Sequence, residues 1–205
     1  MWYPIVIAAL VCYFLGNLNG AVLMSMLFQH EDVRTKGSGN AGLTNFTRNY
    51  GAGKSAYVIL IDAGKTVLAC LVGGLVMKNF DMAKEGMILG GLCVSVGHSF
   101  PILLGFKGGK GALSGLSVAA VVDWRCAVLL LTVFIICVVL TRYVSLGSVL
   151  GAISFALFFG ILYTDRPMIM GIGIFMGLLV VFMHRSNLKR LFRGTESKFY
   201  FKKKN

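Results

Sequence analysis

The sequence predicts an all-α, polytopic membrane protein of about seven transmembrane helices, with the N-terminus outside and the C-terminus in the cytoplasm. Of its 205 residues, 57% are apolar and only 14% are charged, whereas soluble domains carry roughly 25% charged residues. The mean hydropathy of +0.78 agrees with this prediction. The apolar residues also gather in runs of membrane-spanning length, and a soluble fold with such a surface would not stay in water.

The apolar runs give the positions of the helices. A helix needs about 20 apolar residues to span a bilayer, and we predict segments near 4–28, 55–77, 86–104, 111–122, 126–140, 145–163 and 167–183. The fourth segment is short, because 12 residues rise only about 18 Å. It crosses if it is tilted or continued by flanking residues, and Asp123-Trp124-Arg125 is the best turn after it. If it is re-entrant instead, the count falls to six.

Basic residues set the orientation. With seven crossings and the N-terminus outside, 15 of the 20 Lys and Arg residues fall in cytoplasmic loops or the tail, and four fall outside. Positive charge is retained on the cytoplasmic side of membranes, so this arrangement is favoured over six crossings. The N-terminus lacks the basic region of a cleavable signal peptide, so we expect the first run to remain as a helix.

We expect residues 1–205 to form a single membrane domain, with a basic cytoplasmic tail at 198–205. The net charge of +12 favours anionic lipid as a neighbour. Nucleic acid is not an expected partner, because no base-stacking array accompanies the basic residues. The five cysteines are dispersed in apolar runs and form no CxxC pair, which argues against disulfides and zinc. We expect no metal and no cofactor, and infer no obligate protein partner.

The first of three polar segments on the predicted cytoplasmic side is GSGNAGLTNFTRNYG, residues 37–51. Glycines 37, 39 and 42 allow positive φ and let backbone N–H groups approach a ligand. Neutral donors and one guanidinium fork suited to phosphate lie among them. These donors are Ser38, Asn40, Thr44, Asn45 and Arg48. A flexible linker is the alternative, although a linker does not need these side chains.

The second polar segment is GHSFPILLGFKGGKG, residues 97–111, in which Lys107 and Lys110 flank two glycines. Oriented backbone amides and lysine together can cradle phosphate. The segment is not a Walker A loop, because it is one residue short of GxxxxGK and Gly111 stands where Ser or Thr would bind magnesium. ATP chemistry is therefore disfavoured, and a basic interfacial turn is the alternative to a phosphate site.

The third polar segment has two parts, TRYVSLGS at 141–148 and FMHRSNLKRLFRGTES at 182–197. The first part contains Ser145. The second contains His184 and Asn187, which are three positions apart and would share one helix face. For His184, a structural role and a catalytic role remain equally open.

Two ionisable residues, Asp62 and Lys65, lie inside the second apolar run. Their spacing of three allows a pair on one helix face, which lowers the cost of placing charge at membrane depth. We expect this pair to organise helix packing rather than to take part in catalysis. We expect His98, at a helix–loop junction, to be structural.

Several catalytic motifs are absent from the sequence. No HxxxxD dyad, GxSxG elbow or HExxH site exists, and Glu196 is the only carboxylate in the polar segments. A scarcity of carboxylates suits a site for anions, since like charges repel. It leaves histidine as the only obvious general base among the side chains.

Taken in order, the four motifs GSGNAGLTNFTRNYG, GHSFPILLGFKGGKG, TRYVSLGS and HRSNLKRLFRGTE resemble the bacterial acyl-phosphate:glycerol-3-phosphate acyltransferases. The resemblance covers about residues 15–198. Leu43 stands where the family usually has Ala, and Phe46-Thr47 replaces a more aliphatic pair. We see no reason for these departures to abolish activity.

The resemblance implies transfer of an acyl group from acyl phosphate to the sn-1 hydroxyl of glycerol 3-phosphate, an early step of bacterial phospholipid synthesis. It implies a multi-pass protein of the bacterial inner membrane with its active site on the cytoplasmic face. Its implied phosphate-binding residues are Ser38, Gly39, Asn40, Thr44, Asn45, Arg48, Lys107, Gly108, Gly109, Lys110 and Ser145. Its implied catalytic residues are His184, Asn187, Lys107 and Ser38.

The general base stays open between histidine and the phosphate of the substrate, which could accept the hydroxyl proton itself. Acyl phosphate is already activated, so positioning and charge neutralisation would supply much of the catalysis. The main rival function is transport of phosphate or organic anions, and a structural scaffold is third. The polar segments gather on one predicted membrane face and no inverted repeat is visible, which favours the enzyme.

Overall fold

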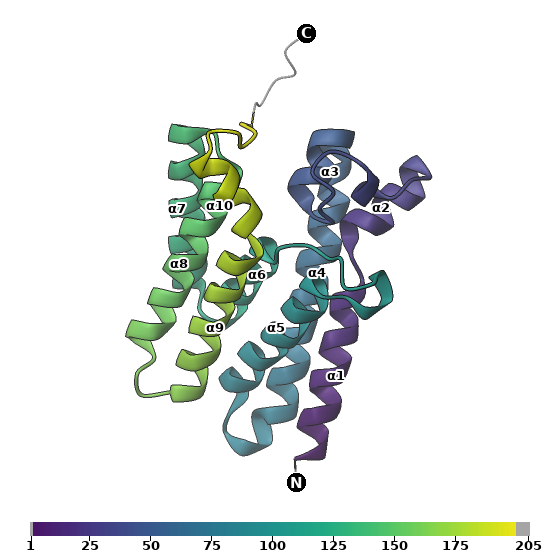
Figure 1. Cartoon of the computed structure of the whole chain (residues 1–205). Helices are drawn as coiled ribbons and strands as arrows, with labels where there is room; N and C mark the ends of the chain where they lie inside the picture. Colours follow the sequence, from purple (N-terminus) through teal and green to yellow (C-terminus); the bar gives the residue numbers. More distant parts are fainter. Residues whose placement is uncertain (1, 200–205) are drawn as a thin grey trace. The chain divides into compact units, whose positions relative to one another are not determined.

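The regular elements are all helical in residues 2–199, the part of the chain that the computed structural model describes (Figure 1). The chain forms two compact units, Met1–Val122 and Asp123–Asn205, here called unit 1 and unit 2. Unit 1 contains α1 (Tyr3–Asn17), α2 (Gly20–Gln29), η1 (Val33–Thr35), α3 (Leu43–Tyr50), α4 (Ala52–Met77), η2 (Lys78–Phe80), α5 (Ala83–Ser99), η3 (Ile102–Leu104) and α6 (Ala112–Val122). Unit 2 contains α7 (Trp124–Thr141), α8 (Val144–Leu162), α9 (Pro167–Met183) and α10 (Arg185–Phe192). Of the predicted tail 198–205, residues 200–205 lie outside the described range.

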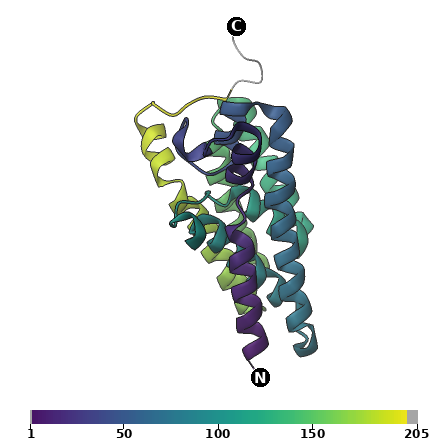
Figure 2. The same ribbon diagram turned by 90° about the vertical axis from the view of Figure 1, so that its right-hand side faces the viewer.

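In unit 1, glycines let the long helices pack with their backbones close together. A Cβ on Gly73 would collide with the carbonyl of Gly86, and a Cβ on Gly90 would collide with the carbonyl of Ala69. Gly97 meets the backbone of α1 in the same way. Small residues allow such close approach between membrane helices. Association there depends on van der Waals packing, because burying apolar surface from lipid gives little free energy. Figures 1 and 2 show the result, with α1 running alongside α4 and α5.

The first predicted segment, 4–28, is not one continuous helix. The helical hydrogen bonding is interrupted at Leu18 and Asn19, and α2 departs from the line of α1 (Figure 1). Asn19 caps the new helix, because its Oδ1 accepts from the backbone N of Val22 at 3.0 Å. An Asn at this position accepts a hydrogen bond from a backbone N–H that the start of a helix leaves without a helical partner. This lowers the free-energy cost of breaking the helix inside an apolar run.

In unit 2, α7, α8 and α9 follow one another as hairpins. Asp123 marks the predicted joint after Val122 and caps α7, accepting from the backbone N of Arg125 at 3.0 Å. Arg125 also donates to this carboxylate from its side chain, as does the hydroxyl of Tyr163 at 2.9 Å. The hydrogen bond from Arg125 and then that from Tyr163 hold the pKa of Asp123 at about 2, against the effect of burial. The start of α7 is therefore fixed by hydrogen bonds to the Asp123 carboxylate.

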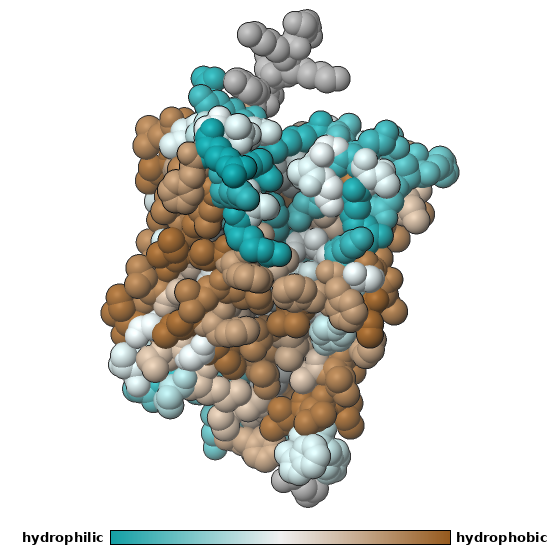
Figure 3. Space-filling model, in the orientation of Figure 1, coloured by the Kyte–Doolittle hydropathy of each residue, from teal (hydrophilic) through white to brown (hydrophobic). Residues whose placement is uncertain are grey.

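Among the described residues, five helical stretches are long and apolar enough to cross a membrane. They are Tyr3–Gln29, Ala52–Phe80, Ala83–Leu104, Trp124–Thr141 and Val144–Leu162. The pair α9 and α10 would be a sixth, bent by 54°, and α6 has only 11 residues. In Figure 3 most of the surface along α1 is apolar, whereas polar residues gather over α3. The predicted number of seven crossings and the orientation of the termini remain predictions.

Candidate functional site

The first polar segment is half loop and half helix. Gly37 and Gly39 have φ of 55° and 71°, as predicted, and turn the chain back on itself. Gly42 differs from the prediction, because its φ of −146° is extended backbone at the start of α3. Its small size matters instead, since a Cβ there would lie 2.7 Å from Nδ2 of Asn40. Thr44, Asn45 and Arg48 therefore belong to a short helix, not to the loop that precedes it.

Asn45 holds this loop together. Its Nδ2 lies 3.0–3.1 Å from the carbonyls of Val33, Lys36 and Asn40, and its Oδ1 accepts from the backbone N of Ser38 at 3.0 Å. The side chain is only 3% exposed. Oδ1 also accepts from Nδ2 of Asn49 in α3 at 3.2 Å. Both amide hydrogens and both lone pairs are thus used within the protein, so the structure favours a positioning task for Asn45 over direct contact with a ligand.

The second polar segment packs its glycines against His98. The backbone N of Gly109 donates to the His98 carbonyl at 3.0 Å, and a Cβ on Gly109 would collide with Nε2 of the His98 ring. A Cβ on Gly108 would collide with the same carbonyl. The two glycines are therefore needed for close packing on one side of the turn. Lys107 is exposed and Lys110 is half-buried.

The two segments meet in unit 1, where the second segment is contacted by Arg34, three residues before the start of the first. Arg34 Nη1 donates to the Leu104 carbonyl at 2.8 Å and to the Lys107 carbonyl at 3.4 Å. Its Nε and Nη2 hold the Asp32 carboxylate at 2.7–3.1 Å, and this interaction lowers the pKa of Asp32. Gly109 also lies next to the carbonyl of Ala41, 2.9 Å from where its Cβ would be. Arg34 was not predicted as a site residue from the sequence, although its place just before the glycines could have suggested a contact.

Asp62 and Lys65 form the predicted pair, with Nζ 2.8 Å from Oδ1 and both side chains 3% exposed. The pair reaches beyond α4, because Lys65 Nζ lies 3.0 Å from Nδ1 of His98. The predicted packing role is therefore supported, and it includes His98, which is itself 5% exposed.

In unit 2, the third polar segment is organised by a carboxylate. Ser145 Oγ and Asn187 Nδ2 each donate to Oε1 of Glu196 at 2.7 Å, and Arg190 Nε donates to Oε2 at 2.6 Å. Burial alone would raise the pKa of Glu196, but these three hydrogen bonds outweigh it and the pKa is lowered. The role of Glu196 was not predicted from the sequence, because its carboxylate reaches Ser145 only after the chain turns at Gly194, which has a φ of 68°.

His184 lies at the bend between α9 and α10, so it and Asn187 are not on one straight helix. Its Nδ1 is 2.8 Å from the carbonyl of Val180. A carbonyl can only accept, so Nδ1 carries the proton and the basic lone pair of the neutral ring is on Nε2. A general base at His184 would therefore act through Nε2.

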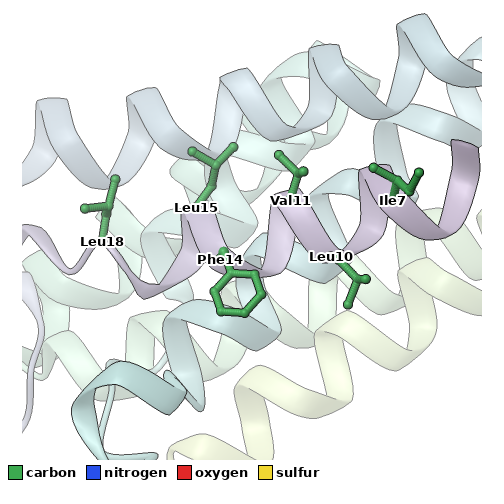
Figure 4. A pocket seen from close by; sticks show the side chains of 6 residues that line it. All are labelled: Ile7, Leu10, Val11, Phe14, Leu15 and Leu18. Atoms are coloured by element: carbon green, nitrogen blue, oxygen red, sulfur yellow. The ribbon is translucent and has the colours of Figure 1, made fainter.

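An apolar pocket of about 430 Å³ lies on the surface of α1 (Figure 4). Its lining consists of Ile7, Leu10, Val11, Phe14, Leu15 and Leu18. None of the predicted phosphate-site residues lines it, so the pocket belongs to the apolar surface of α1 and not to the polar site. Within residues 2–199, no group of three or more His, Cys, Asp or Glu side chains is placed to hold a metal ion.

The model of the family described as glycerol-3-phosphate acyltransferase matches residues 6–194. The chain belongs to this family. The glycerol-3-phosphate acyltransferase of Finegoldia magna is 40% identical over 195 residues, 95% of this chain and 96% of its own length. That of Clostridioides difficile (strain 630) is 37% identical over 203 residues, 98% of each chain.

Solved structures agree with this assignment. A crystal structure of PlsY (YgiH), an integral membrane glycerol 3-phosphate acyltransferase, in its glycerol 3-phosphate form has a TM-score of 0.85 and 30% identity, covering 96% of both chains. Its lysophosphatidic acid form has a TM-score of 0.83 and 29% identity, covering 96% of this chain and 95% of that one. The predicted all-helical membrane fold and the predicted family are confirmed, and the chain is an integral membrane acyltransferase.

Proposed function

We propose that this acyltransferase moves the acyl group of an acyl phosphate to the sn-1 hydroxyl of glycerol 3-phosphate, giving 1-acyl-glycerol 3-phosphate and inorganic phosphate. The observation that carries the proposal is the meeting of two glycine-bearing basic segments in unit 1. The Ala41 carbonyl of the first lies against Gly109 of the second, and Arg34, just before the first, donates to carbonyls of the second. Each substrate carries a phosphate group, and the reaction brings the two groups close together. Backbone N–H groups and basic side chains on adjoining turns would offset their repulsion.

In this proposal, the residues of unit 1 bind phosphate. Arg48 and Lys107 are both exposed, which makes them accessible to substrate, and a guanidinium and an ammonium suit phosphate oxygens. Lys107 and Ser38 would also stabilise charge that develops at the reacting groups. The further binding residues are Gly39, Asn40, Thr44, Gly108, Gly109 and Lys110, with Asn45 holding the loop in shape.

The chemical step needs little help from a side-chain base. The sn-1 oxygen attacks the acyl carbonyl, a C–O ester bond forms, and the bond from the carbonyl carbon to the phosphate oxygen breaks. We propose that phosphate of the substrate accepts the hydroxyl proton. Glu196 is a poor candidate for this task, because its pKa is lowered and both carboxylate oxygens accept hydrogen bonds.

We propose that His184 and Asn187 in unit 2 also serve the reaction, near the acyl transfer. Ser145, which the resemblance placed on phosphate, donates its one hydroxyl hydrogen to Glu196, so we assign it to holding that carboxylate. His184→Ala tests the assignment of the base. If the substrate phosphate accepts the proton, the variant keeps a measurable chemical step, slowed about 10- to 100-fold by lost positioning. Near-total loss of single-turnover chemistry in a well-folded His184→Ala protein would identify histidine as the base.

We propose further that the whole chain acts as one enzyme in a bacterial inner membrane, with seven crossings, N-terminus outside, and polar segments in the cytoplasm. Single cysteines placed at Lys36 and at Lys84, in a background without native cysteine, would test this orientation. A membrane-impermeant thiol reagent should label position 84 from the outside, and position 36 only in opened cells. Labelling of position 36 from outside would reverse the topology.

The reaction itself is tested with purified protein in detergent. Acyl phosphate and glycerol 3-phosphate together should give equal amounts of inorganic phosphate and lysophosphatidic acid. Acyl-CoA and acyl carrier protein conjugates serve as matched donors, and neither should support turnover. Turnover with acyl-CoA but not with acyl phosphate would overturn the donor assignment. Absence of turnover with all donors, together with anion uptake into sealed vesicles, would favour the transporter instead.

A further inference from the structure

The break between α1 and α2 leaves backbone groups without helical partners inside the membrane-spanning part of unit 1. Lys65 Nζ donates to the carbonyls of Gly16, at 3.2 Å, and Leu18. Asp62 Oδ1 accepts from the backbone N of Gly20, the first residue of α2, at 3.1 Å. A cation thus meets the carbonyl end of one helix and an anion meets the N–H end of the next, as helix dipoles favour. The ion pair replaces the hydrogen bonds that the break removes.

The same ion pair sets the orientation of His98. Nδ1 of His98 lies 3.0 Å from Nζ of Lys65 and 3.8 Å from Oδ1 of Asp62. An ammonium group has hydrogens to donate but no lone pair, so Nδ1 is the acceptor. The neutral imidazole then carries its proton on Nε2. Nε2 is the ring atom that lies against Gly109.

His98 bears on the turn at two points. Its ring fills the place of a Cβ on Gly109, and its carbonyl accepts from the Gly109 backbone N at 3.0 Å. Gly109 is buried, while Lys107, two residues earlier, is exposed. Because the turn has only four residues, the buried contact at Gly109 limits the positions that the exposed Lys107 can take.

The break also ties down both polar segments. Asn17 Oδ1 accepts from the backbone N of Leu103 at 3.1 Å, ahead of the turn. Asn19 Nδ2 donates to the carbonyl of Ala41 at 2.9 Å, in the first segment. Asn17 and Asn19 are 5% and 4% exposed. The cluster of Asp62, Lys65 and His98, together with the two asparagines, therefore forms one buried polar network that contacts both segments.

We infer that His98, held by Lys65 and Asp62, is a positioning residue for the turn of residues 107–110. It acts through Gly109 on the placement of Lys107, and it touches no substrate. The inference deepens the proposed function and rests on its assignment of Lys107 to phosphate. It goes beyond the packing role expected from the sequence, because it couples a buried ion pair to the reactivity of an exposed lysine.

A double-mutant cycle between His98 and Lys107 tests the inference, with kcat/KM for glycerol 3-phosphate as the readout. His98→Ala should lower kcat/KM between about 10- and 100-fold, because misplacement by about 1 Å costs that much. In a Lys107→Met background, the same change should lower it no more than about twofold. Equal effects in the two backgrounds would show that His98 acts only on general packing, and would overturn the inference.

Val94→Ala is the matched control, because Val94 is fully buried on the same helix four residues earlier. Its effect should be the same in both backgrounds. His98→Asn keeps an acceptor for Lys65 without the ring over Gly109, so it should fold with wild-type thermal stability and show the same loss as His98→Ala. Full activity in His98→Asn would overturn the inference. Unchanged kinetics in Lys107→Met alone would instead overturn the phosphate assignment of the proposed function.

Discussion

The two units treat negative charge in opposite ways. In unit 1, the carboxylates of Asp32 and Asp62 are each paired with a basic side chain, and Lys107 is exposed to receive an anion. In unit 2, the protein supplies its own anion, since Glu196 accepts hydrogen bonds from three polar side chains. Small polar and basic residues in a motif can therefore receive a ligand or hold an internal carboxylate. Sequence pattern alone does not separate the two uses.

The largest expected effect tests whether unit 1 binds the phosphate of the substrate. Lys107→Met should lower kcat/KM for glycerol 3-phosphate at least about 100-fold, because the site would lose the ammonium group that we propose stabilises the charge developing on the phosphate. Lys36→Ala is the matched control, since Lys36 is an exposed lysine of the same unit that pairs with Glu31 at 3.1 Å. Its kinetics should remain near wild type. Similar losses in both variants would mean that general positive charge, not a phosphate site, drives the reaction.

The next effect concerns stability and belongs to unit 2. Glu196→Ala should lower the free energy of unfolding by about 3 kcal/mol, because the buried donors of Ser145 and Asn187 and the partly exposed Arg190 lose their acceptor. Glu196→Gln keeps an oxygen acceptor and should lose less. Thermal unfolding in detergent measures both. A Glu196→Ala protein with wild-type stability but no activity would contradict the structural role and move Glu196 into the chemistry.

The pH dependence of unit 2 follows from the same carboxylate. The folded-state pKa of Glu196 lies below its ordinary value of 4.5. Its contribution to stability is therefore fully present above the unfolded pKa and is lost as the pH falls through the folded pKa. The melting temperature of the wild type should fall on acidification from about pH 5. Glu196→Gln has no group to titrate there, so its curve should be flatter.

A smaller effect should appear at the joint between the two polar segments. Arg34 uses separate nitrogens for Asp32 and for the carbonyls of Leu104 and Lys107. Lysine has a single nitrogen and cannot reproduce this fork, so Arg34→Lys should lower kcat/KM about 5- to 10-fold with little loss of stability. An unchanged kcat/KM would show that the two segments keep their geometry without the bridge.

The sequence predicts the long helices well, because the length of an apolar run is a local property. The predicted segments 126–140, 145–163 and 167–183 agree with α7, α8 and α9 to within two residues at each end. The pair of Asp62 and Lys65 was likewise predictable from its spacing on one helix face.

The missed features depend on contacts between distant parts of the chain. Ser145 donates to Glu196, 51 residues away, and no local pattern indicates that contact. α3 was hidden by its glycine-rich flanks, although Leu43, Phe46 and Tyr50 pack together on one cluster at helical spacing. The break at Asn19 was missed because the mean hydropathy of Tyr3–Gln29 is high enough for one span, although Asn17 and Asn19, between Gly16 and Gly20, mark its place in the sequence.

The smallest expected effect concerns Gly42, which a motif-based interpretation would count as essential. Its φ is extended, so alanine is not strained there, and the nearest obstacle is the flexible amide of Asn40 at 2.7 Å. Gly42→Ala should keep the melting temperature within about 2 °C of wild type. Gly37→Ala is the contrast, because its φ is 55° and its Cβ would press on Oδ1 of Asn45, and it should unfold at clearly lower temperature. Since Gly42→Ala displaces the amide of Asn40, a roughly threefold fall in kcat/KM would mark that amide as a substrate donor. Unchanged kinetics would assign Asn40 to loop structure. The basic side chains and backbone N–H groups of unit 1 would then be the groups that bind the substrate phosphate.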